Sequence, residues 1–593
     1  MIVPTGRYAL LLLLCLVLAG PGVAEENENA APEREGNALV SWRSPVSALS
    51  VAGVRLLGIN DLHGELETRV DPNAPGGAAV LAAYLAGERD ENPKRTLLLV
   101  AGDSIGASAL LSGALRDEPT MAVLNALTAG DCPLLTRDWP MRPSPVVTRC
   151  RIVSTVGNHE FDRGVPELER LLYGGRHPDG PVLGHDWAGT KVPFLAANVV
   201  RRDGQAPFLP AAAIVDLAGI RIGVIGAVTA ETPMLVPAPG IGAIQFLPEA
   251  GPINAAIASL RAQGVHAIVL LIHEGLAGPT NPQPAPLRLS ETRGRLAEVL
   301  AGIDGGIDVV VAGHTHRVNN LLLPLRDGSL ALVVQARSYG TAYSEIDLEI
   351  DTRTGAVIAK SATVLPTWSR VGPGATPDRA IAKIVAKAKR ATAAIGSRQV
   401  GMAAAAIRRA DSAQPEWPLG NFVADAQRSA AATELAFMNT GGLRNDLEAG
   451  PVTFGELYGI QPFGNTLMKA TLTGEQVLRL LEQQWSGIHA AVPRYLAVAG
   501  LRYVFDLSRP VGQRIVAAED SEGLPIDTRR RYTIAANDFL LGGGDGYAVF
   551  AEAIDAQPVM KDIQALEAYV TGAPDAVRPM LDGRARRRDA AAR

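Results

Sequence analysis

Side chains that bind metal ions gather at the ends of five apolar runs between residues 50 and 320. The runs are VRLLGIN, TLLLVAG, RIVSTVG, HAIVLLI and IDVVVAG, and the residues that follow them include Asp61, His63, Asp103, Asn158, His159, Asp162, His273, His314 and His316. Five of the nine histidines of the chain lie in these motifs. Ligands of α/β proteins bind at the carboxyl ends of the strands, so this is the pattern that an active site produces.

The residue types indicate a site for divalent cations. Carboxylate, imidazole and amide oxygen suit ions such as Zn²⁺ or Mn²⁺, and the absence of cysteine from the motifs argues against a closed structural zinc site. In Asp61-x-His63 and His314-x-His316, the period of two along a strand predicts that both donors face the same side of an extended backbone. A single histidine at a strand end is more often structural, but five motifs together favour a metal site.

The composition predicts a folded chain of two large domains. A single hydrophobic core rarely organises as many as 593 residues, and 47% hydrophobic with 20% charged residues excludes bulk disorder. The net charge of −5 argues against a dedicated nucleic-acid binder. Short apolar runs alternate with helical stretches over 51–365 and again over 399–575, which predicts two α/β domains.

The segments outside these domains are expected to be a signal peptide (1–24), a flexible leader (25–50), a linker with a helix (366–398) and a basic tail (576–593). In the linker, Thr376 is expected to cap a helix whose first residue is Pro377 and which Gly396 ends. The apolar run of the signal peptide, Tyr8–Ala19, is too short to span a bilayer. We therefore expect a protein exported to a periplasm or beyond, without a stable membrane anchor; an uncleaved anchor is the alternative.

Two cysteines remain after the signal peptide, Cys132 and Cys150. An even pair in an oxidising compartment predicts one disulfide, and two buried thiols are the alternative.

In this order, DLHG, GD, GNHEFD, a strand-end histidine and GHTH resemble the calcineurin-like metallophosphoesterases. NTGGLRND, QPFGNTL and NDFLLGGGDGY narrow the resemblance to the secreted 5′-nucleotidase family, which includes UDP-sugar hydrolases and 2′,3′-cyclic nucleotide phosphodiesterases. The resemblance covers roughly residues 52 to 572. It implies a four-layer αββα metallophosphoesterase sandwich over 51–365, joined by a helix to a smaller α/β substrate-binding domain, the 5′-nucleotidase C-terminal domain, over 399–575.

The resemblance also implies two adjacent divalent ions, with Zn, Mn or Co expected. Asp61, His63, Asp103 and His316 would hold one ion, and Asp103, Asn158, His273 and His314 the other. His159 would stabilise the phosphoryl group or protonate the leaving oxygen, and Asp162 would orient it. In the second domain, the implied substrate contacts are Phe463 and Phe539 to the base, Asp545 to the ribose, Arg444 and Asn465 to phosphate or base, and Arg409 or Arg408 to phosphate.

The implied activity is release of phosphate from nucleoside 5′-monophosphates by a metal-activated hydroxide. UDP-sugar hydrolysis and 2′,3′-cyclic phosphodiester hydrolysis are the alternatives, followed by a thiosulfohydrolase-like enzyme and a catalytically idle nucleotide-binding protein. Gly102–Gly106 also matches the G-x-S-x-G pattern of serine esterases. About twenty residues, 131–149, form an insertion relative to the family, and we interpret them as a surface loop closed by the two cysteines.

Overall fold

The computed structural model describes residues 38–45, 48, 50–67, 76–142, 144–203, 206–278, 282–283, 285–409, 414–490 and 492–589. The predicted signal peptide lies outside these residues. No helix within the described ranges is both long and apolar enough to cross a membrane.

Two large sheets form the first domain. The strands of the first sheet lie in the order β1 (Val40–Arg43), β17 (Val357–Pro366), β16 (Ala342–Asp351), β2 (Val51–Ile59), β3 (Thr96–Ala101), β6 (Ile152–Thr155) and β7 (Phe194–Leu195). Those of the second lie in the order β14 (Val318–Pro324), β15 (Leu330–Ala336), β13 (Val309–Ala312), β12 (Ala267–His273), β10 (Ile220–Val228), β9 (Ala212–Leu217), β5 (Val146–Cys150) and β4 (Gly130–Asp131). A small separate ribbon pairs β8 (Val199–Arg201) with β11 (Ile244–Phe246).

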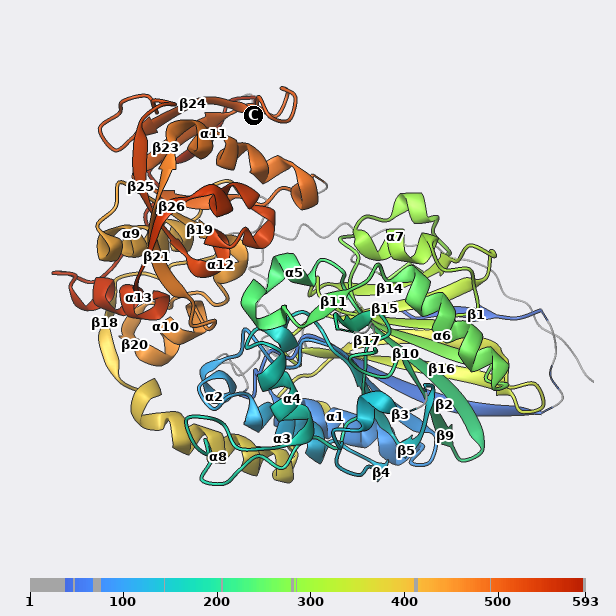
Figure 1. Cartoon of the computed structure of the whole chain (residues 1–593). Helices are drawn as coiled ribbons and strands as arrows, with labels where there is room; N and C mark the ends of the chain where they lie inside the picture. Colours follow the sequence, from blue (N-terminus) through green and yellow to red (C-terminus); the bar gives the residue numbers. More distant parts are fainter. Residues whose placement is uncertain are drawn as a thin grey trace, which may run out of the picture. The chain divides into compact units, whose positions relative to one another are not determined.

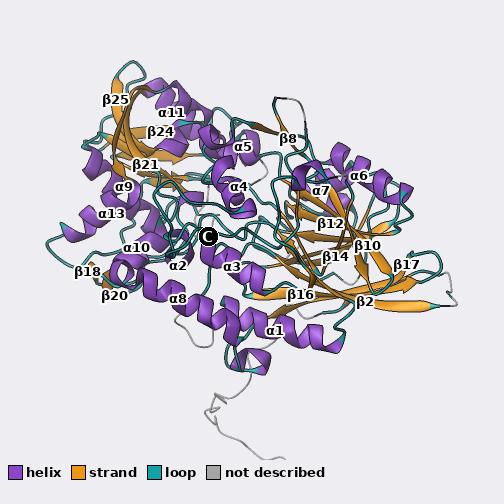
Figure 2. Ribbon diagram, turned by 60° about the horizontal axis from the view of Figure 1, so that its bottom comes forward, coloured by secondary structure: helices purple, strands orange, loops and turns teal. Residues whose placement is uncertain are grey.

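The two sheets are stacked between helices (Figure 2). Every residue of β12 is buried, because alternate side chains enter two different cores. Val269 and Leu271 join the core that contains residues of the first sheet, whereas Leu270 joins the core under α6 and α7. The helices of this domain are α1 (Ala78–Glu91), α2 (Leu110–Gly113), α3 (Glu118–Ala126), α4 (Val165–Tyr173), α5 (Thr232–Leu235), α6 (Ala250–Ala262) and α7 (Arg295–Ala301). The expected four-layer αββα sandwich is therefore confirmed.

Part of the predicted flexible leader is a strand. Val40–Arg43 forms β1, which pairs antiparallel with the outer edge of β17. Val40 is fully buried, and Lys360 of β17 lies 4.9 Å from the ring centroid of Trp42. The backbone hydrogen bonds gained at the sheet edge make this segment a strand in spite of its polar composition.

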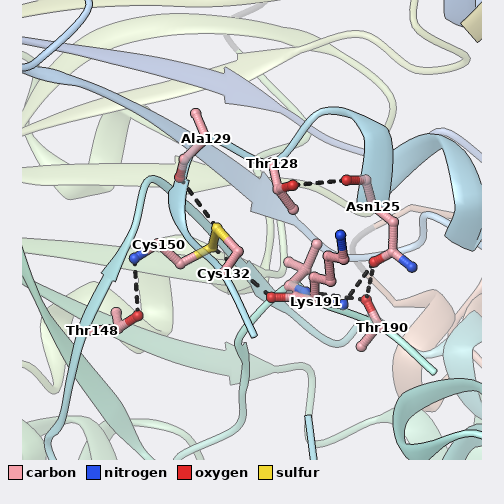
Figure 3. The surroundings of a disulfide bond; sticks show 9 residues. Asn125, Thr128, Ala129, Cys132, Thr148, Cys150, Thr190 and Lys191 are labelled. Atoms are coloured by element: carbon pink, nitrogen blue, oxygen red, sulfur yellow. Dashed lines mark hydrogen bonds between the residues drawn. A yellow bond between two sulfur atoms is a disulfide. The ribbon is translucent and has the colours of Figure 1, made fainter. Parts of the chain in front are cut away.

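The insertion is not only a loop, since it adds β4 and β5 to the edge of the second sheet. The predicted disulfide between Cys132 and Cys150 is confirmed, with a Cα–Cα distance of 4.7 Å (Figure 3). Trp139 lies inside the insertion, is 3% exposed, and donates its indole N–H to the carbonyl of Phe194 at 2.9 Å. The insertion is thereby packed onto the domain by an edge strand and by a buried indole ring.

The linker helix is α8 (Arg379–Gly396), and it begins two residues later than predicted. The carboxylate of Asp378 accepts the backbone N–H of Ile381 at 2.9 Å, so Asp378 is the N-cap in place of Thr376. An aspartate in this position both accepts the free N–H and complements the helix dipole. Gly396 is the last residue of the helix.

The second domain is built on a mixed five-stranded sheet, drawn in orange and red in Figure 1. Its strands lie in the order β22 (Leu496–Ala499), β19 (Leu435–Asn439), β25 (Arg531–Asn537), β21 (Thr466–Thr473) and β26 (Ile554–Lys561). Smaller sheets contain β18 (Gln399–Ala403) with β20 (Gly450–Thr453), and β24 (Ile515–Asp520) with β23 (Leu501–Phe505) and β27 (Ala585–Arg587). The helices are α9 (Pro418–Ala431), α10 (Phe454–Ile460), α11 (Gly474–Glu482), α12 (Asp538–Leu541) and α13 (Asp562–Thr571).

The predicted basic tail also belongs to the fold as far as residue 589. Residues Ala585–Arg587 form β27, parallel to β23. Arg584, 7% exposed, pairs with Asp425 at 2.8 Å and with Asp582 at 2.7 Å. The positive charges of this segment therefore neutralise carboxylates of the second domain.

Candidate metal centre and substrate site

Five strand ends bring the predicted ligands together. In the first sheet β2, β3 and β6 run parallel as neighbours, and in the second sheet β12 and β13 do so. Their carboxyl ends therefore lie at one edge of each sheet. The loops after β2, β3, β6 and β13 carry six of the seven predicted ligands, and His273 is the last residue of β12.

The side chains form two groups, each with ligand atoms within 4.8 Å of one another. The first group is Asp61, His63 and His316, and the second is Asp103, His273 and His314. Asp103 lies between them, because its Oδ2 is 3.0 Å from His273 Nε2 and 3.7 Å from His63 Nε2.

Hydrogen bonds to the backbone leave ring nitrogens available for a metal ion. His63 Nδ1 lies 2.9 Å from the carbonyl of Gly106, and His273 Nδ1 lies 2.8 Å from that of Ala101. Each Nδ1 then carries the proton, and Nε2 offers its lone pair. Asn158 Oδ1 is buried and has no hydrogen-bond partner within the described residues. His273 Nε2 is also buried, and it faces Asp103 Oδ2 at 3.0 Å. An unpaired buried acceptor is costly, so Asn158 Oδ1 fits a bound cation.

The charges of the group also suit divalent ions. Burial raises the pKa of Asp61, but the neighbouring His316 and His273 outweigh it and lower that pKa to about 2. Burial lowers the pKa of His63 well below its ordinary value and that of His314 to about 3. The carboxylate of Asp61 is therefore charged and the imidazoles of His63 and His314 are neutral near pH 7, as metal ligands must be. Burial lowers the pKa of His273, but the charge of Asp103 outweighs it and raises that pKa to about 10.

Five of the seven predicted ligands have a left-handed backbone, which corrects the extended geometry predicted for the Asp61–His63 and His314–His316 pairs. The values of φ are 51° for Asp61, 47° for His63, 49° for Asp103, 72° for His314 and 56° for His316. This conformation costs conformational energy in residues other than glycine, and residues that adopt it are concentrated at functional sites. Strands β2 and β13 end before these residues, and His314 and His316 belong to different groups rather than facing one side.

Hydrogen bonds between the loops hold this backbone in place. Asp61 accepts the backbone N–H of His314 through Oδ1 at 3.1 Å and through Oδ2 at 3.0 Å. The N–H of Tyr339 donates to the carbonyl of Asp61 at 2.7 Å, and its ring centroid lies 5.4 Å from that of His316. Sequence reasoning missed Tyr339, which follows β15 and contacts the predicted ligands Asp61 and His316.

Glu160 is a second residue that sequence reasoning missed, although it lies inside GNHEFD. Its carboxylate accepts the backbone N–H of Gly157, Asp103 (2.9 Å) and Ser104 (2.9 Å). This carboxylate thus joins the loop after β3 to the loop after β6.

His159 and Asp162 form a hydrogen-bonded pair beside the metal ligands. His159 Nδ1 lies 2.9 Å from both carboxylate oxygens of Asp162. Burial lowers the pKa of His159, but the charges of Asp162 and Asp103 oppose it and leave that pKa raised. The ring can therefore carry a proton near neutral pH.

Two second-domain residues reach this site. Arg444 Nη2 lies 3.4 Å from His63 Nε2, and Arg444 Nε is buried without a hydrogen-bond partner in the described part of the chain. The ring centroid of Phe463 lies 5.7 Å from that of His159. The guanidinium and the aromatic ring therefore lie against the candidate metal centre and the His159–Asp162 pair.

The two candidate arginines at 408 and 409 differ in their surroundings. Arg408 forms ion pairs with Asp446 and Glu448. Arg409 donates from Nη1 to the carbonyl of Arg444. Arg409 is thus the neighbour of Arg444.

Asp545 has a left-handed backbone (φ 52°) and accepts a hydrogen bond from Asn439 Nδ2 at 2.7 Å. Arg494, which sequence reasoning missed, lies 3.4 Å from Asp545 Oδ1.

Phe539 packs over Gly544, where an added Cβ would lie 2.5 Å from ring atoms. The backbone N–H of Asp562 donates to the carbonyl of Asn465 at 3.0 Å.

The serine-esterase pattern does not have the geometry of a nucleophile. Ser104 Oγ is buried and has no hydrogen-bond partner among the described residues. An activated serine needs a neighbouring base.

Comparisons with known proteins agree with this architecture. Residues 54–318 match the calcineurin-like phosphoesterase family, and residues 384–552 match the 5′-nucleotidase C-terminal domain. The chain is 33% identical over 497 residues to endonuclease YhcR of Bacillus subtilis, covering 82% of this chain and 37% of that protein. It is 31% identical over 571 residues to cell wall protein Lmo0130 of Listeria monocytogenes, covering 88% of this chain and 68% of that one.

A similar solved structure is that of a 5′-nucleotidase precursor from Thermus thermophilus. The TM-score is 0.71 at 26% identity, and the match covers 91% of this chain and all of that one. The metal-ligand groups, the paired sheets and both family models lead to the same assignment. The chain belongs to the 5′-nucleotidase family of metal-dependent phosphoester hydrolases.

Proposed function

We propose that this chain is an exported dimetal phosphohydrolase that releases phosphate from nucleoside 5′-monophosphates. The observation that carries the proposal is Arg444, whose guanidinium lies 3.4 Å from His63 with a buried, unpartnered Nε. A buried cationic donor without an anionic partner is suited to bind an anion. Since it comes from the second domain, it joins that domain to the phosphate site.

Asp61, His63, Asp103 and His316 would hold one divalent ion, and Asp103, Asn158, His273 and His314 the other. Bound divalent ions supply Lewis-acid activation of water and of phosphoryl oxygens. Zn²⁺, Mn²⁺ or Co²⁺ suits this set of oxygen and nitrogen donors.

His159 donates a hydrogen bond or a proton to the substrate during transfer. Its Nδ1–H is held by Asp162 at 2.9 Å, so Nε2 is the atom that can face the substrate. The raised pKa keeps a proton available there, and this is the role of a general acid. Arg444 orients the phosphate, with Arg409 as the second cation.

The second domain selects the nucleotide. Phe463 and Phe539 stack on the base, Asp545 accepts hydrogen bonds from the ribose, and Asn465 supplies a further polar contact. Stacking tolerates every base, because each has a π-face.

Export is supported by the signal-like segment 1–24 and by the Cys132–Cys150 disulfide, since disulfides persist in oxidising compartments.

Product formation from a substrate panel tests the proposal, measured as phosphate release for AMP and by chromatography of the cleavage products for the other substrates. The panel contains AMP, UDP-glucose, 2′,3′-cyclic AMP and, because one relative is named an endonuclease, single-stranded DNA. We expect AMP to have the highest kcat/KM, chelation to abolish turnover, and Mn²⁺, Co²⁺ or Zn²⁺ to restore it. Asp103→Asn should abolish turnover and Asp131→Asn, an exposed carboxylate, should not. Full activity after exhaustive chelation contradicts the mechanism, and preference for another substrate contradicts the substrate class.

A further inference from the structure

Arg163 links the catalytic segment to the second domain. It follows Asp162 directly in the chain, and its Nη2 donates to the carbonyl of Gly113 at 2.7 Å. Its Nε lies 3.8 Å from Asp117 Oδ2, with 28% of the arginine side chain exposed. The guanidinium is thus fixed at the end of α2.

Tyr458, from α10 of the second domain, reaches the same place. A Cβ added to Gly113 would lie 2.5 Å from the Tyr458 hydroxyl, so the glycine permits this close approach. Both side chains therefore meet at Gly113, and the positive charge of Arg163 acts on the tyrosine hydroxyl. Helix α10 also packs against α2 and α8 (Figures 1 and 2).

The carboxylate that faces Arg163, that of Asp117, is buried and held by hydrogen bonds of its own. Asp117 is 2% exposed and accepts the hydroxyl of Ser112 at 2.8 Å. Its backbone N–H donates to the carbonyl of Ser112 at 2.9 Å, which closes the turn between α2 and α3. The guanidinium therefore has a fixed carboxylate and a fixed carbonyl on the first-domain side.

The same two chain segments touch at a second point. Phe463 lies five residues after Tyr458, and His159 lies four residues before Arg163. The rings of Phe463 and His159 have centroids 5.7 Å apart. One contact alone would let the segments pivot, whereas two contacts fix the orientation of 458–463 against 159–163.

We propose that Arg163 and Tyr458 are positioning residues that fix Phe463 relative to His159 and Asp162. When Phe463 holds the base of a nucleotide, this fixed distance places its phosphate at the His159–Asp162 pair. This inference rests on the proposed nucleotide hydrolysis and adds to it a pair of residues outside the metal and base contacts.

The test is Tyr458→Phe, which keeps the ring and removes the hydroxyl. We expect the KM for AMP to rise about tenfold, the range of one polar contact to a charged group. The kcat/KM for p-nitrophenyl phosphate, which lacks a base to stack on Phe463, should stay within twofold. Tyr569→Phe is the matched control, because it also removes a hydroxyl, in α13 of the same domain. It should leave both the KM for AMP and the kcat/KM for p-nitrophenyl phosphate unchanged.

A second variant, Arg163→Met, examines the pair. Combined with Tyr458→Phe, it should raise the KM for AMP no further than Arg163→Met does alone. Multiplied effects, equal losses on both substrates, or an unchanged KM in Tyr458→Phe would each overturn the inference. If the unaltered protein fails to hydrolyse AMP, the proposed function is wrong instead, so the two failures are distinguishable.

Discussion

Replacing Arg444 by methionine removes the guanidinium that contacts the metal ligands while keeping an unbranched apolar side chain. No carboxylate of the described residues pairs with Arg444, and its guanidinium contacts His63 Nε2 at 3.4 Å. The substitution therefore breaks no ion pair within the protein. We expect the effect to fall on the bound phosphate.

The magnitude follows from the donors that are lost. A hydrogen bond from a charged donor is worth about 1.5–3 kcal/mol, and 1.36 kcal/mol corresponds to a tenfold change in rate. Nε has no partner and Nη2 has only the weak contact to His63, so both can serve an oxyanion. We expect kcat/KM to fall at least about 10- to 100-fold, the equivalent of one such hydrogen bond, and further where both bonds are lost.

The assay compares AMP with p-nitrophenyl phosphate at saturating metal ion, with metal content measured on the same samples. Both substrates carry the phosphate, so both should lose equally, and metal content should not change. Arg479→Met is the control, because Arg479 pairs with Glu552 and is half exposed. A loss on AMP alone would assign Arg444 to the base, and loss of a metal ion would make it a support for His63; either result refutes the reasoning.

Three further predictions concern specificity and stability. Phe463→Ala and Phe539→Ala should raise the KM for AMP at least tenfold but change hydrolysis of p-nitrophenyl phosphate much less; equal losses would make both residues structural. Cys132→Ser opens the loop to Cys150 and should lower the unfolding free energy by ~3 kcal/mol, measured by denaturant titration; an unchanged midpoint contradicts this. Burial raises the pKa of Asp562 to about 7 from 3.8, so the folded protein retains the proton longer than the unfolded chain. The parent should therefore lose stability relative to Asp562→Asn as pH rises from about 4 to about 7, by on the order of 4 kcal/mol, and a pH-independent difference would exclude this carboxyl.

Much of the site was determined by sequence-local physics. The apolar runs before Asp61, Asp103 and His273 are strands β2, β3 and β12, because buried strands need continuous apolar residues. Thr473 caps α11 through a reciprocal bond with Gln476, as the spacing of three residues requires. The motifs also identified residues of both metal groups. The assignment of each ligand to one of the two ions came from the family resemblance.

The backbone at the ligands could not be predicted from the period of two. His314 and His316 leave β13 in left-handed conformations and join different groups, because hydrogen bonds from other loops compensate the strain. Those bonds connect Asp61 with residues about 250 positions away. No local pattern encodes them.

The ends of the folded region were decided in the same way. The segments 25–50 and 576–593 are polar, which predicted a leader and a tail, yet β1 and β27 pair with the edges of existing sheets. The sequence by itself determined the strands that precede the site, the cap of α11, the cysteine pair and the kinds of ligand, since these depend on neighbouring residues and on side-chain chemistry. Only the tertiary structure decided which loops interlock and which edges are covered, and it placed Arg163 against Tyr458, because these contacts join residues hundreds of positions apart.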